Sequence, residues 1–511
     1  MRRWAPVRNH KIETAQGNEE LMFNLFKMDP ESQYVRLRKN QMKSQISRSI
    51  IFAGLFLVGC TQGPDYRPHY AKDLAVPEQY VGGNDEIDTA DISKWWSRFN
   101  DPILQELIDT ALSKNLDIAQ SAALVVQARE SLVQSGADRL PAVNISSGSG
   151  RNFNSGAPDS WSFTRSIDAS WSADLFGGLK RSQQAALASY QAAGYSLANA
   201  RTLIAAELAR NYVAVRSLQA RLRIARGSLR NQDSNLQIAK WRAQAGLVSS
   251  VDVEQAKAQR AQTAAAIPLL KQSEAAARYR LAVLTGQAPG AVDSLLSDDG
   301  RLPTLPDFIG RGAPANILRQ RPDILSSERN LASATAQIGV AKAQLFPSLT
   351  LAGNIGSTSR EFGNLTDLVT GGLFASIAQS LFDAGSRKSA VRSRIAAADG
   401  AFSAYRSAIL NALEEVENAA ISRRTAEARI SAFSDQRTAS NNAAILARAN
   451  YRAGLIDFQR LLETERSLLS ANDSLAAAQA DRLTSAIQLY LALGGGWQPI
   501  PQNTNNEEAS K

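Results

Sequence analysis

A unit of two strands and two long helices occurs twice in this chain, and this repeat limits the fold more than any other feature. The matching segments are 137–141 with 343–347 and 175–176 with 381–382, at an offset of 206, and 245–248 with 453–456, at an offset of 208. A two-residue insertion in the long helix of the second copy would reconcile the offsets. Each copy has too little sheet to close a barrel alone, so we expect several chains to assemble.

The composition favours long helices and excludes helical membrane spans. Only 17 of the 511 residues are proline and 7% are aromatic. No apolar stretch reaches the ~18 to 20 residues that a membrane-spanning helix needs. If the chain crosses a bilayer, it must therefore do so with strands.

The apolar run from Ile50 to Cys60 follows a short basic segment that starts at Met42, which is typical of a secretory signal. Its last four residues, Leu57-Val58-Gly59-Cys60, resemble a bacterial lipobox, in which the cysteine is lipidated. Cys60 is the only cysteine, which excludes disulfides; a buried free thiol is the alternative. We expect residues 1–41 to be an over-extended gene start. By the same resemblance to bacterial lipoproteins, a threonine rather than an aspartate at position 61 favours sorting to the outer membrane.

Charge and residue types argue against nucleic-acid binding and catalysis. The net charge of +9 falls to about +4 once the basic residues 1–59 are removed, which is too little to indicate a nucleic-acid partner. After Cys60 the chain has one histidine, His69, and no phosphate-binding loop or metal-ligand cluster. We therefore expect no enzyme, no metal and no cofactor.

One segment reads as a membrane strand. From Trp161 to Leu175 the odd positions are apolar, except for Arg165, and the even positions are polar. Fifteen residues exceed the ~9 to 11 that a tilted bilayer strand requires. We expect a partner strand beginning at Ala142–Ser146, an external loop over Asn152–Asp159, and second-copy strands at Leu349–Gly356 and Leu373–Phe382. A soluble hairpin packed on helices is the alternative.

Residues 178–245 contain no proline and predict one helix of about 100 Å. Gly246–Ser249 turns the chain, and a return helix runs to Leu284 with an interruption near Pro268. The second copy follows from Gly385, turns at Gly454–Asp457 and ends near Leu493–Gly496. An amphipathic helix starts at Asp101-Pro102, and Arg321-Pro322-Asp323 opens another helix, where we expect a structural role.

Several unusual motifs appear together and in order: Gly63–Pro68 (GPDYRP), Trp95–Pro102 (WWSRFNDP), and Arg321–Asp323 followed by Phe346-Pro347. They resemble the lipoprotein outer-membrane factors of the TolC/NodT type over residues 60–497. The resemblance implies a homotrimer with a twelve-stranded β-barrel, four strands per chain, continued by a long α-helical periplasmic barrel. It also implies a periplasmic adaptor and an inner-membrane pump of the resistance-nodulation-division class as partners.

The resemblance further implies a constriction at the two helical turns. Its candidate lining residues are Asp252, Tyr451, Asp457, Glu463 and Arg466, and its candidate adaptor-docking residues are Gly246, Leu247, Gly454 and Leu455. Local alternatives stay open. Ser249 with Asp252 fits a capping box, Asp457 fits an N-cap, Glu463 with Arg466 fits an i,i+3 pair, and the glycines fit helix termination.

We expect five segments: an extension and signal (1–59), a lipidated extended segment (60–100), two efflux repeats (101–300 and 301–497) and a polar tail (498–511). The predicted function is a passive outer-membrane exit duct for drugs or other toxic small molecules, lipid-anchored and reaching into the periplasm. The alternatives are a type I secretion duct and a periplasmic coiled-coil scaffold or adaptor lipoprotein without a channel.

Overall fold

The computed structural model describes residues 61–69, 71–74, 76–81, 92–296, 300–305, 320–364 and 368–498, all within one compact unit that begins at Cys60. The expected signal over 1–59, the start at Met42, Cys60 itself and the tail after Gln498 lie outside the described residues. Within the described ranges, every helix is too short or too polar to cross a bilayer.

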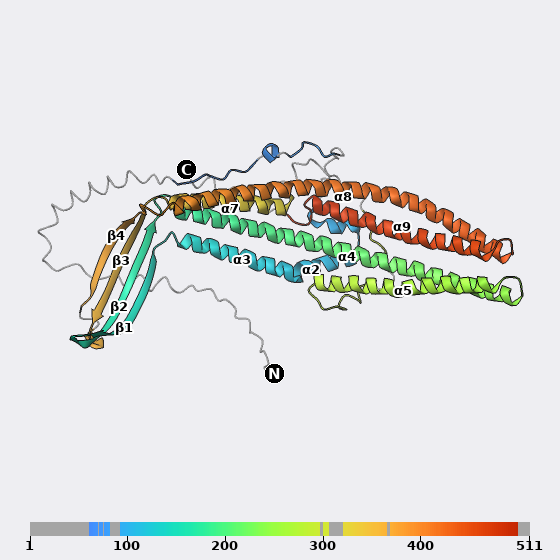
Figure 1. The fold of residues 1–511 in the computed structure, drawn as a ribbon, viewed down its shortest axis with the longest axis horizontal. Coiled ribbons are helices and arrows are strands. Elements are labelled where there is room, and N and C mark those ends of the chain that lie inside the picture. The colour runs from blue at the N-terminus through green and yellow to red at the C-terminus, as the bar shows by residue number, and fades with distance from the viewer. Residues whose placement is uncertain are drawn as a thin grey trace. The chain divides into compact units, whose positions relative to one another are not determined.

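The two copies of the repeat fold alike (Figure 1). The first comprises α3 (Leu116–Ala137), β1 (Ala142–Asn154), β2 (Ala157–Ala173), α4 (Gly178–Gln244) and α5 (Ser250–Leu284), and the second comprises α7 (Pro322–Ala343), β3 (Ser348–Ser359), β4 (Thr370–Ala378), α8 (Ser386–Arg452) and α9 (Phe458–Ala492). Paired helices have equal lengths: 22 residues in α3 and α7, 67 in α4 and α8, and 35 in α5 and α9. Four short elements complete the described chain: η2 (Ala71–Leu74), η3 (Ile92–Phe99), α2 (Pro102–Lys114) and η5 (Phe362–Asn364).

The long helices end within one or two residues of the predicted positions, because glycine turns set their ends. The predicted interruption near Pro268 was wrong, since α5 continues through that residue as one helix. A proline inside a helix removes one hydrogen bond, and the turns on both sides can hold the helix together.

The two-residue insertion of the second copy lies before α8, which corrects the prediction that it lies inside the long helix. Gly177 and Gly385 precede the two long helices with left-handed φ values of 74° and 85° and are 208 positions apart. The extra residues are therefore Asp383 and Ala384. Ala384 itself has a φ of 52°, a conformation that glycine adopts at much lower cost.

Asp383 has a local function in this connection. Its carboxylate accepts hydrogen bonds from the backbone N–H groups of Gly385 at 2.9 Å and Arg387 at 3.1 Å. These bonds satisfy donors that a helix start leaves unpaired, and they lower the pKa of Asp383. In the first copy Asp174 caps α4 in the same way, through Leu179 and Lys180.

The strands form one antiparallel sheet in the order β1-β2-β3-β4. β1 reaches Asn154 and β2 starts at Ala157, so the predicted loop over Asn152–Asp159 is only a tight turn at Ser155-Gly156, where Gly156 has a φ of 112°. β4 ends at Ala378 and not at Phe382. Among the described residues, no strand pairs with the outer edges of β1 and β4.

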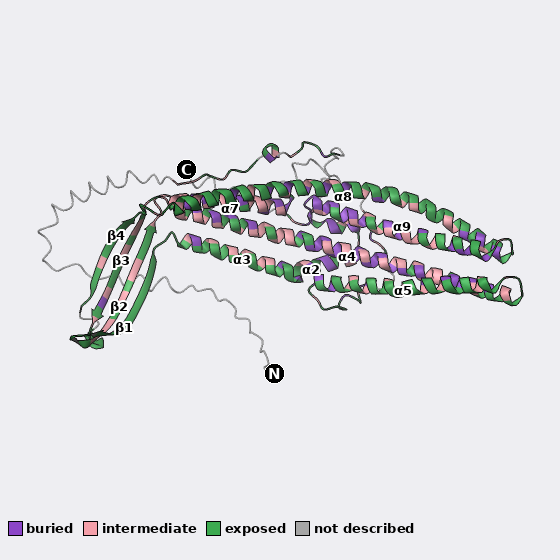
Figure 2. Cartoon of the chain, viewed as in Figure 1, coloured by how far each residue is buried: buried purple, intermediate pink, exposed green. Residues whose placement is uncertain are grey.

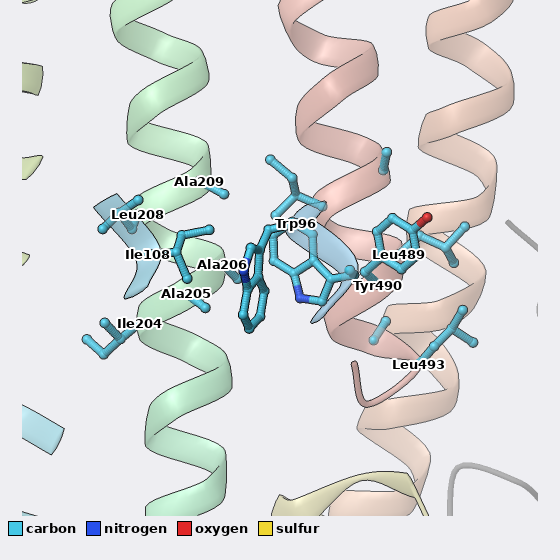
Figure 3. Close-up of a cluster of buried hydrophobic side chains, with 14 of the residues drawn as sticks. Trp96, Ile108, Ile204, Ala205, Ala206, Leu208, Ala209, Leu489, Tyr490 and Leu493 are labelled. Carbon is cyan, nitrogen blue, oxygen red and sulfur yellow. The ribbon is translucent and has the colours of Figure 1, made fainter. Parts of the chain in front are cut away.

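The main core lies where α4 meets α2, η3 and the end of α9, and Figure 2 shows that buried residues gather there while the strands carry few. The Trp95 and Tyr490 rings stack at a centroid distance of 5.6 Å, and Trp96 packs beside them (Figure 3). Asp101 caps α2 as predicted, and its carboxylate also accepts a 2.7 Å hydrogen bond from Tyr212. The tryptophan motif therefore belongs to the core.

Arg321 also has a structural role. Pro322 begins α7, and the buried Arg321 guanidinium pairs with Asp323 at 2.7 Å and Glu415 at 2.6 Å. It also donates a 3.0 Å hydrogen bond to the Ala492 carbonyl at the end of α9. One side chain thus fixes the start of α7 to α8 and α9.

Candidate functional site

The candidate site is the pair of turns that join α4 to α5 and α8 to α9. In each turn a glycine in the left-handed region ends the long helix: Gly246 has a φ of 70° and Gly454 a φ of 78°. The N–H groups of Leu247 and Leu455 then bond back to the Arg242 and Asn450 carbonyls at 2.8 and 2.9 Å, as expected for a Schellman motif. The glycines are therefore helix terminators.

The leucines that follow these glycines are the most prominent apolar residues of the turns. Leu247 is 67% exposed and Leu455 is 73% exposed. Each lies on a backbone fixed by the turn hydrogen bonds, so the turn holds an apolar residue at a fixed place on the tip. An exposed leucine at the same place in both copies is a feature that helix termination alone does not require.

Tyr451 lies inside the tip and not on its surface. Its ring packs against Phe458 at a centroid distance of 5.4 Å and against the Arg242 guanidinium at 4.7 Å. Arg242 also donates a 2.5 Å hydrogen bond to the Tyr451 carbonyl. Because Arg242 lies in the last turn of α4 and Tyr451 in the last turn of α8, these contacts join the two hairpins.

The Tyr451 hydroxyl is buried and has no hydrogen-bond partner among the residues that the structure describes. Burial raises the pKa of Tyr451, the Arg242 charge opposes this shift, and the Asp252 charge reinforces it. Asp252 is half-buried in the first turn of α5, close enough for its charge to act on Tyr451. A buried unpaired hydroxyl is rare and marks a place where a small movement would allow a new bond.

The other predicted residues make local contacts or link the hairpins. Asp457 caps α9 by accepting a 2.8 Å hydrogen bond from the Arg460 N–H. Glu463 pairs with Arg460 at 3.1 Å, both side chains being exposed, and not with Arg466 as the local alternative held. Arg466 instead donates to Gln259 on α5, which is a second link between the hairpins.

Two further links were missed from the sequence. The buried Glu465 of α9 accepts two hydrogen bonds from Arg448 of α8, at 2.5 and 2.9 Å, and a longer one from Asn235 of α4. Nearer the core, Arg221 of α4 forms a two-pronged pair with Asp473 of α9 at 2.6 and 3.0 Å. The residues of the Asn235–Glu465 and Arg221–Asp473 pairs lie more than 200 positions apart on different hairpins, so no local pattern identifies these links.

The described residues contain no group of three or more His, Cys, Asp or Glu side chains that could hold a metal ion. The arrangement is instead one of bridged helices. Asp252 and Tyr451 are brought together, Arg466 bridges the hairpins, and Asp457 and Glu463 lie exposed on α9. Such an arrangement can hold two hairpins in one position and release them when its links break.

Comparison with known proteins gave consistent matches. The family model "Outer membrane efflux protein" matches residues 107–287 and 313–495. Nodulation protein T of Rhizobium leguminosarum bv. trifolii is 30% identical over 460 residues, covering 88% of this chain and 97% of that protein. The pyoverdine export outer membrane protein OpmQ of Pseudomonas aeruginosa is 30% identical over 466 residues, with the same coverage.

Solved structures of similar chains have the same fold. The outer-membrane channel OprN superposes with a TM-score of 0.77 at 33% identity, covering 86% of this chain and 100% of that one. The open state of the MtrE outer membrane channel of Neisseria gonorrhoeae gives 0.77 at 27% identity, covering 87% and 100%.

Proposed function

Because the chain belongs to the outer membrane efflux protein family and is an outer-membrane efflux channel, we propose that it is the passive, lipid-anchored exit duct of a resistance-nodulation-division pump. The cargo we propose is small molecules, since similar proteins are named for pyoverdine export and toluene efflux. The chain itself then performs no catalytic step, and energy comes from the inner-membrane pump. The sequence ranges 101–300 and 301–497 are proposed as its two efflux repeats.

The observation that carries this proposal is a sheet with two open edges attached to helices of about 100 Å. Unpaired strand edges are not tolerated in lipid, so β4 of one chain must pair with β1 of the next. Three chains give twelve strands, a number that leaves a water-filled lumen. The helices continue the duct into the periplasm.

The apolar surface of α8 supports the same assembly. Leu410 and Ile421 are about half exposed, whereas their first-copy equivalents Thr202 and Val213 on α4 are 2% and 1% exposed. The first-copy residues are covered by other parts of the same chain, Thr202 by Gly496 beyond the end of α9. By the repeat, we expect the exposed α8 residues to be covered by the neighbouring chain.

We propose that the hairpin tips form the closed end of the duct. Arg242 and Tyr451 hold the hairpins together, Arg466 adds a second bridge, and Asp252, Asp457 and Glu463 add negative charge. Repeated three times around the axis, these acids would form rings that favour cations. Opening then requires loss of the bridges while each hairpin stays intact.

The exposed Leu247 and Leu455, fixed by Gly246 and Gly454, are the proposed contacts for the periplasmic adaptor. Because hydrogen bonds already fix the backbone of both turns, binding orders only the leucine side chains, which limits the entropy lost on binding. Six such leucines would be presented by a trimer, two from each chain.

The proposed lipid anchor at Cys60 is supported by the residues that follow it. Gln62 donates a 3.1 Å hydrogen bond to the Phe176 carbonyl, where β2 leads into α4. The buried Arg181 donates to the carbonyls of Gln62 and Gly63 and pairs with Asp65 at 2.7 Å. Two residues span about 7 Å, so a lipid on Cys60 would reach the membrane surface where the strands leave it.

Electron microscopy and mass determination of the mature protein, extracted from outer membranes in mild detergent, test this function. We expect a threefold tube whose helical part is about 100 Å long. A monomer, a two-stranded rod or fractionation with the inner membrane would contradict it. Mass spectrometry of the N-terminal peptide tests the lipid separately, because an unmodified Cys60 would leave the channel intact and remove the anchor.

A further inference from the structure

We propose that the lumen-facing side of the sheet carries a binding site for an organic cation, formed by Asp168, Asn354 and Phe374. Its ligand is an ammonium group joined through several bonds to an apolar group. The site rests on the proposed function, because only a barrel made of several chains turns this face of the sheet to a water-filled lumen. Amphiphilic cations are thereby a cargo class that the wall of the duct itself binds.

The two faces of the sheet differ in composition. One face carries the odd-numbered residues and is largely apolar, as at Ile145, Ile167 and Ile355, which are partners across β1, β2 and β3. The even-numbered residues form the other face, which consists mainly of serine, threonine, asparagine and glycine. In a membrane barrel the apolar face turns to lipid, so the polar face lines the lumen.

Two residues differ from the rest of this polar face. Among the described strand positions, Asp168 of β2 is its only charged residue and Phe374 of β4 is its only aromatic residue. The Phe374 side chain is 61% exposed. An aromatic ring exposed among small polar side chains contributes little to packing, which leaves binding as a use for it.

The neighbouring chain would leave this ring uncovered. Within the chain, Asp168 of β2 is the partner of Asn354 on β3. Shifted by the repeat offset of 206, the same pair becomes Phe374 with Gly148 of the next chain. A glycine has no side chain to cover the ring, so the ring stays open to the lumen of a trimer.

Hydroxyl groups orient the half-buried Asp168 carboxylate. Ser166 donates a 2.6 Å hydrogen bond to one of its oxygens, and the Ser146 hydroxyl lies 2.9 Å from that of Ser166. Among the residues that the structure describes, no lysine or arginine forms an ion pair with Asp168. Its negative charge is therefore held in place on the lumen face and is available to a cation.

The Phe374 ring leans along β4 toward the row of residues that contains Asp168. Asp168, Asn354 and Gly372 are partners across β2, β3 and β4 and form this row. A Cβ atom on Gly372 would lie 2.7 Å from the far end of the Phe374 ring and 3.4 Å from the Asn354 side-chain oxygen. The ring and the amide therefore meet in the space that the glycine leaves, and Asp168 lies at the other end of the same row.

The spacing of these groups fits an organic cation and not a small inorganic ion. Asp168 and Gly372 lie two strands apart, which is about 10 Å. A single small ion therefore cannot contact the carboxylate and the ring together.

A molecule with an ammonium group several bonds away from an apolar group matches this spacing. Its ammonium pairs with the Asp168 carboxylate and donates a hydrogen bond to the Asn354 side-chain oxygen. Its apolar part lies on the Phe374 ring, where contact removes apolar surface from water. Each chain of the trimer offers one such site.

Current block of single trimers in planar bilayers tests the site, with 4-phenylbutylammonium added at the strand end of the channel. We expect Asp168→Asn and Phe374→Thr each to raise the concentration for half block about fivefold, the effect of one exposed ion pair or one aromatic contact. Both side chains face the lumen, so we expect both variants to form trimers. Equal block of the two variants and the unchanged channel would overturn the site.

Two controls separate the site from a general preference for cations. Asp159→Asn removes a negative charge from the same strand near the β1–β2 turn, outside the proposed site, and should leave the block unchanged. Methylammonium, which lacks the apolar group, should act equally on Phe374→Thr and on the unchanged channel. If Asp159→Asn weakened the block as much as Asp168→Asn, charge alone would explain the effect and the site would be wrong.

A second measurement uses the unchanged trimer in detergent and does not require an open tip. A photoreactive aryl azide derivative of 4-phenylbutylammonium is cross-linked to the trimer, and the labelled peptides are mapped. We expect label in the segment that contains Phe374, reduced by excess 4-phenylbutylammonium and not by the anion 4-phenylbutanoate. Label spread evenly over the lumen, or reduced equally by the anion, would contradict the site. A chain that forms no trimer would instead contradict the proposed duct.

Discussion

Arg242 is the residue that links the tip of the first helical hairpin to the tip of the second. Its hydrogen bond goes to the Tyr451 backbone and its cation–π contact to the Tyr451 ring, so a single side chain from the first repeat fixes the end of the second. The first-copy position of Arg242 corresponds to Asn450 in the second copy, 208 positions later. Only the first copy therefore has an arginine at this position, so the contact that links the two tips in the proposed gate runs from the first copy to the second.

Replacement of Arg242 by alanine should open the tip. A hydrogen bond from a charged group contributes about 2 kcal/mol, so its loss corresponds to a roughly 30-fold larger open population. We expect single-channel recordings in planar bilayers to show higher conductance at rest. Two variants serve as controls. Lys240→Ala removes a positive charge two positions earlier, on another face of α4, and should leave the conductance unchanged. Tyr451→Phe keeps the backbone acceptor and the aromatic ring, so this channel should stay closed. A closed Arg242→Ala channel would remove the gate role.

The acids of the tip determine ion preference if they line the opening. Asp252→Asn together with Glu463→Gln removes six negative charges from a trimer without changing side-chain size, so we expect the preference for cations to decrease. Reversal potentials in a salt gradient measure this preference. Glu254→Gln is the control, since Glu254 is on the same helix as Asp252 but is not among the proposed lining residues. Unchanged reversal potentials would leave Asp252 and Glu463 as helix-end residues only.

At the scale of elements, the connection from β4 to α8 contains the clearest strain. Ala384 has a φ of 52° because the two inserted residues must turn the chain before Gly385. Ala384→Gly should therefore stabilise the chain by about 1 kcal/mol. Thermal unfolding of the trimer measures the change. Ala390→Gly, inside α8, should instead destabilise the chain by about 1 kcal/mol, and a decrease for both variants would contradict the strain argument.

The elements also show what the sequence could predict. The ends of α4, α5, α8 and α9 follow from glycines and from caps such as Asp457, whose signals lie within a few residues. The extension of β1 to Asn154 was missed because its serines, glycines and asparagines favour loops, and pairing with β2 overrides that preference. The two-residue insertion could not be placed from the sequence, because the offset between motifs does not show at which residue α8 begins.

Candidate site residues were predictable only in part, for the same reason. Tyr451 and Asp252 were identified by resemblance, and the charge of Asp252 does act on Tyr451. The bridges made by Arg242, Glu465 and Arg221 join residues far apart in the chain, and only the packing of one hairpin on the other reveals them.

At the scale of the whole molecule, the repeat predicts contacts between chains that a single chain cannot contain. Since β4 must pair with β1 of the next chain, α8, which follows β4, must lie beside α3, which precedes β1. Within one chain the equivalent pair is α4 with α7, where Ser196 and Ser326 lie 2.9 Å apart. Shifting these positions by the repeat offsets of 208 and 206 gives Ala404 on one chain and Gln120 on its neighbour.

Cysteines at these two positions should therefore form a disulfide between chains. Ser196 and Ser326 are close enough for cysteines at these positions to form a disulfide within one chain. By the repeat, Ala404→Cys with Gln120→Cys should form the equivalent disulfide between chains and give covalent trimers on non-reducing gels. Ser196→Cys with Ser326→Cys should give only monomers. Cys60 is the only native cysteine, which keeps the background low. Ala404→Cys with Gln127→Cys is the register control, because seven residues along a helix displace the thiol by about 10 Å. If only the control pair gave covalent trimers, the chains would associate in another register. If Ala404→Cys with Gln120→Cys formed a disulfide only within monomers, the repeat would not govern the assembly.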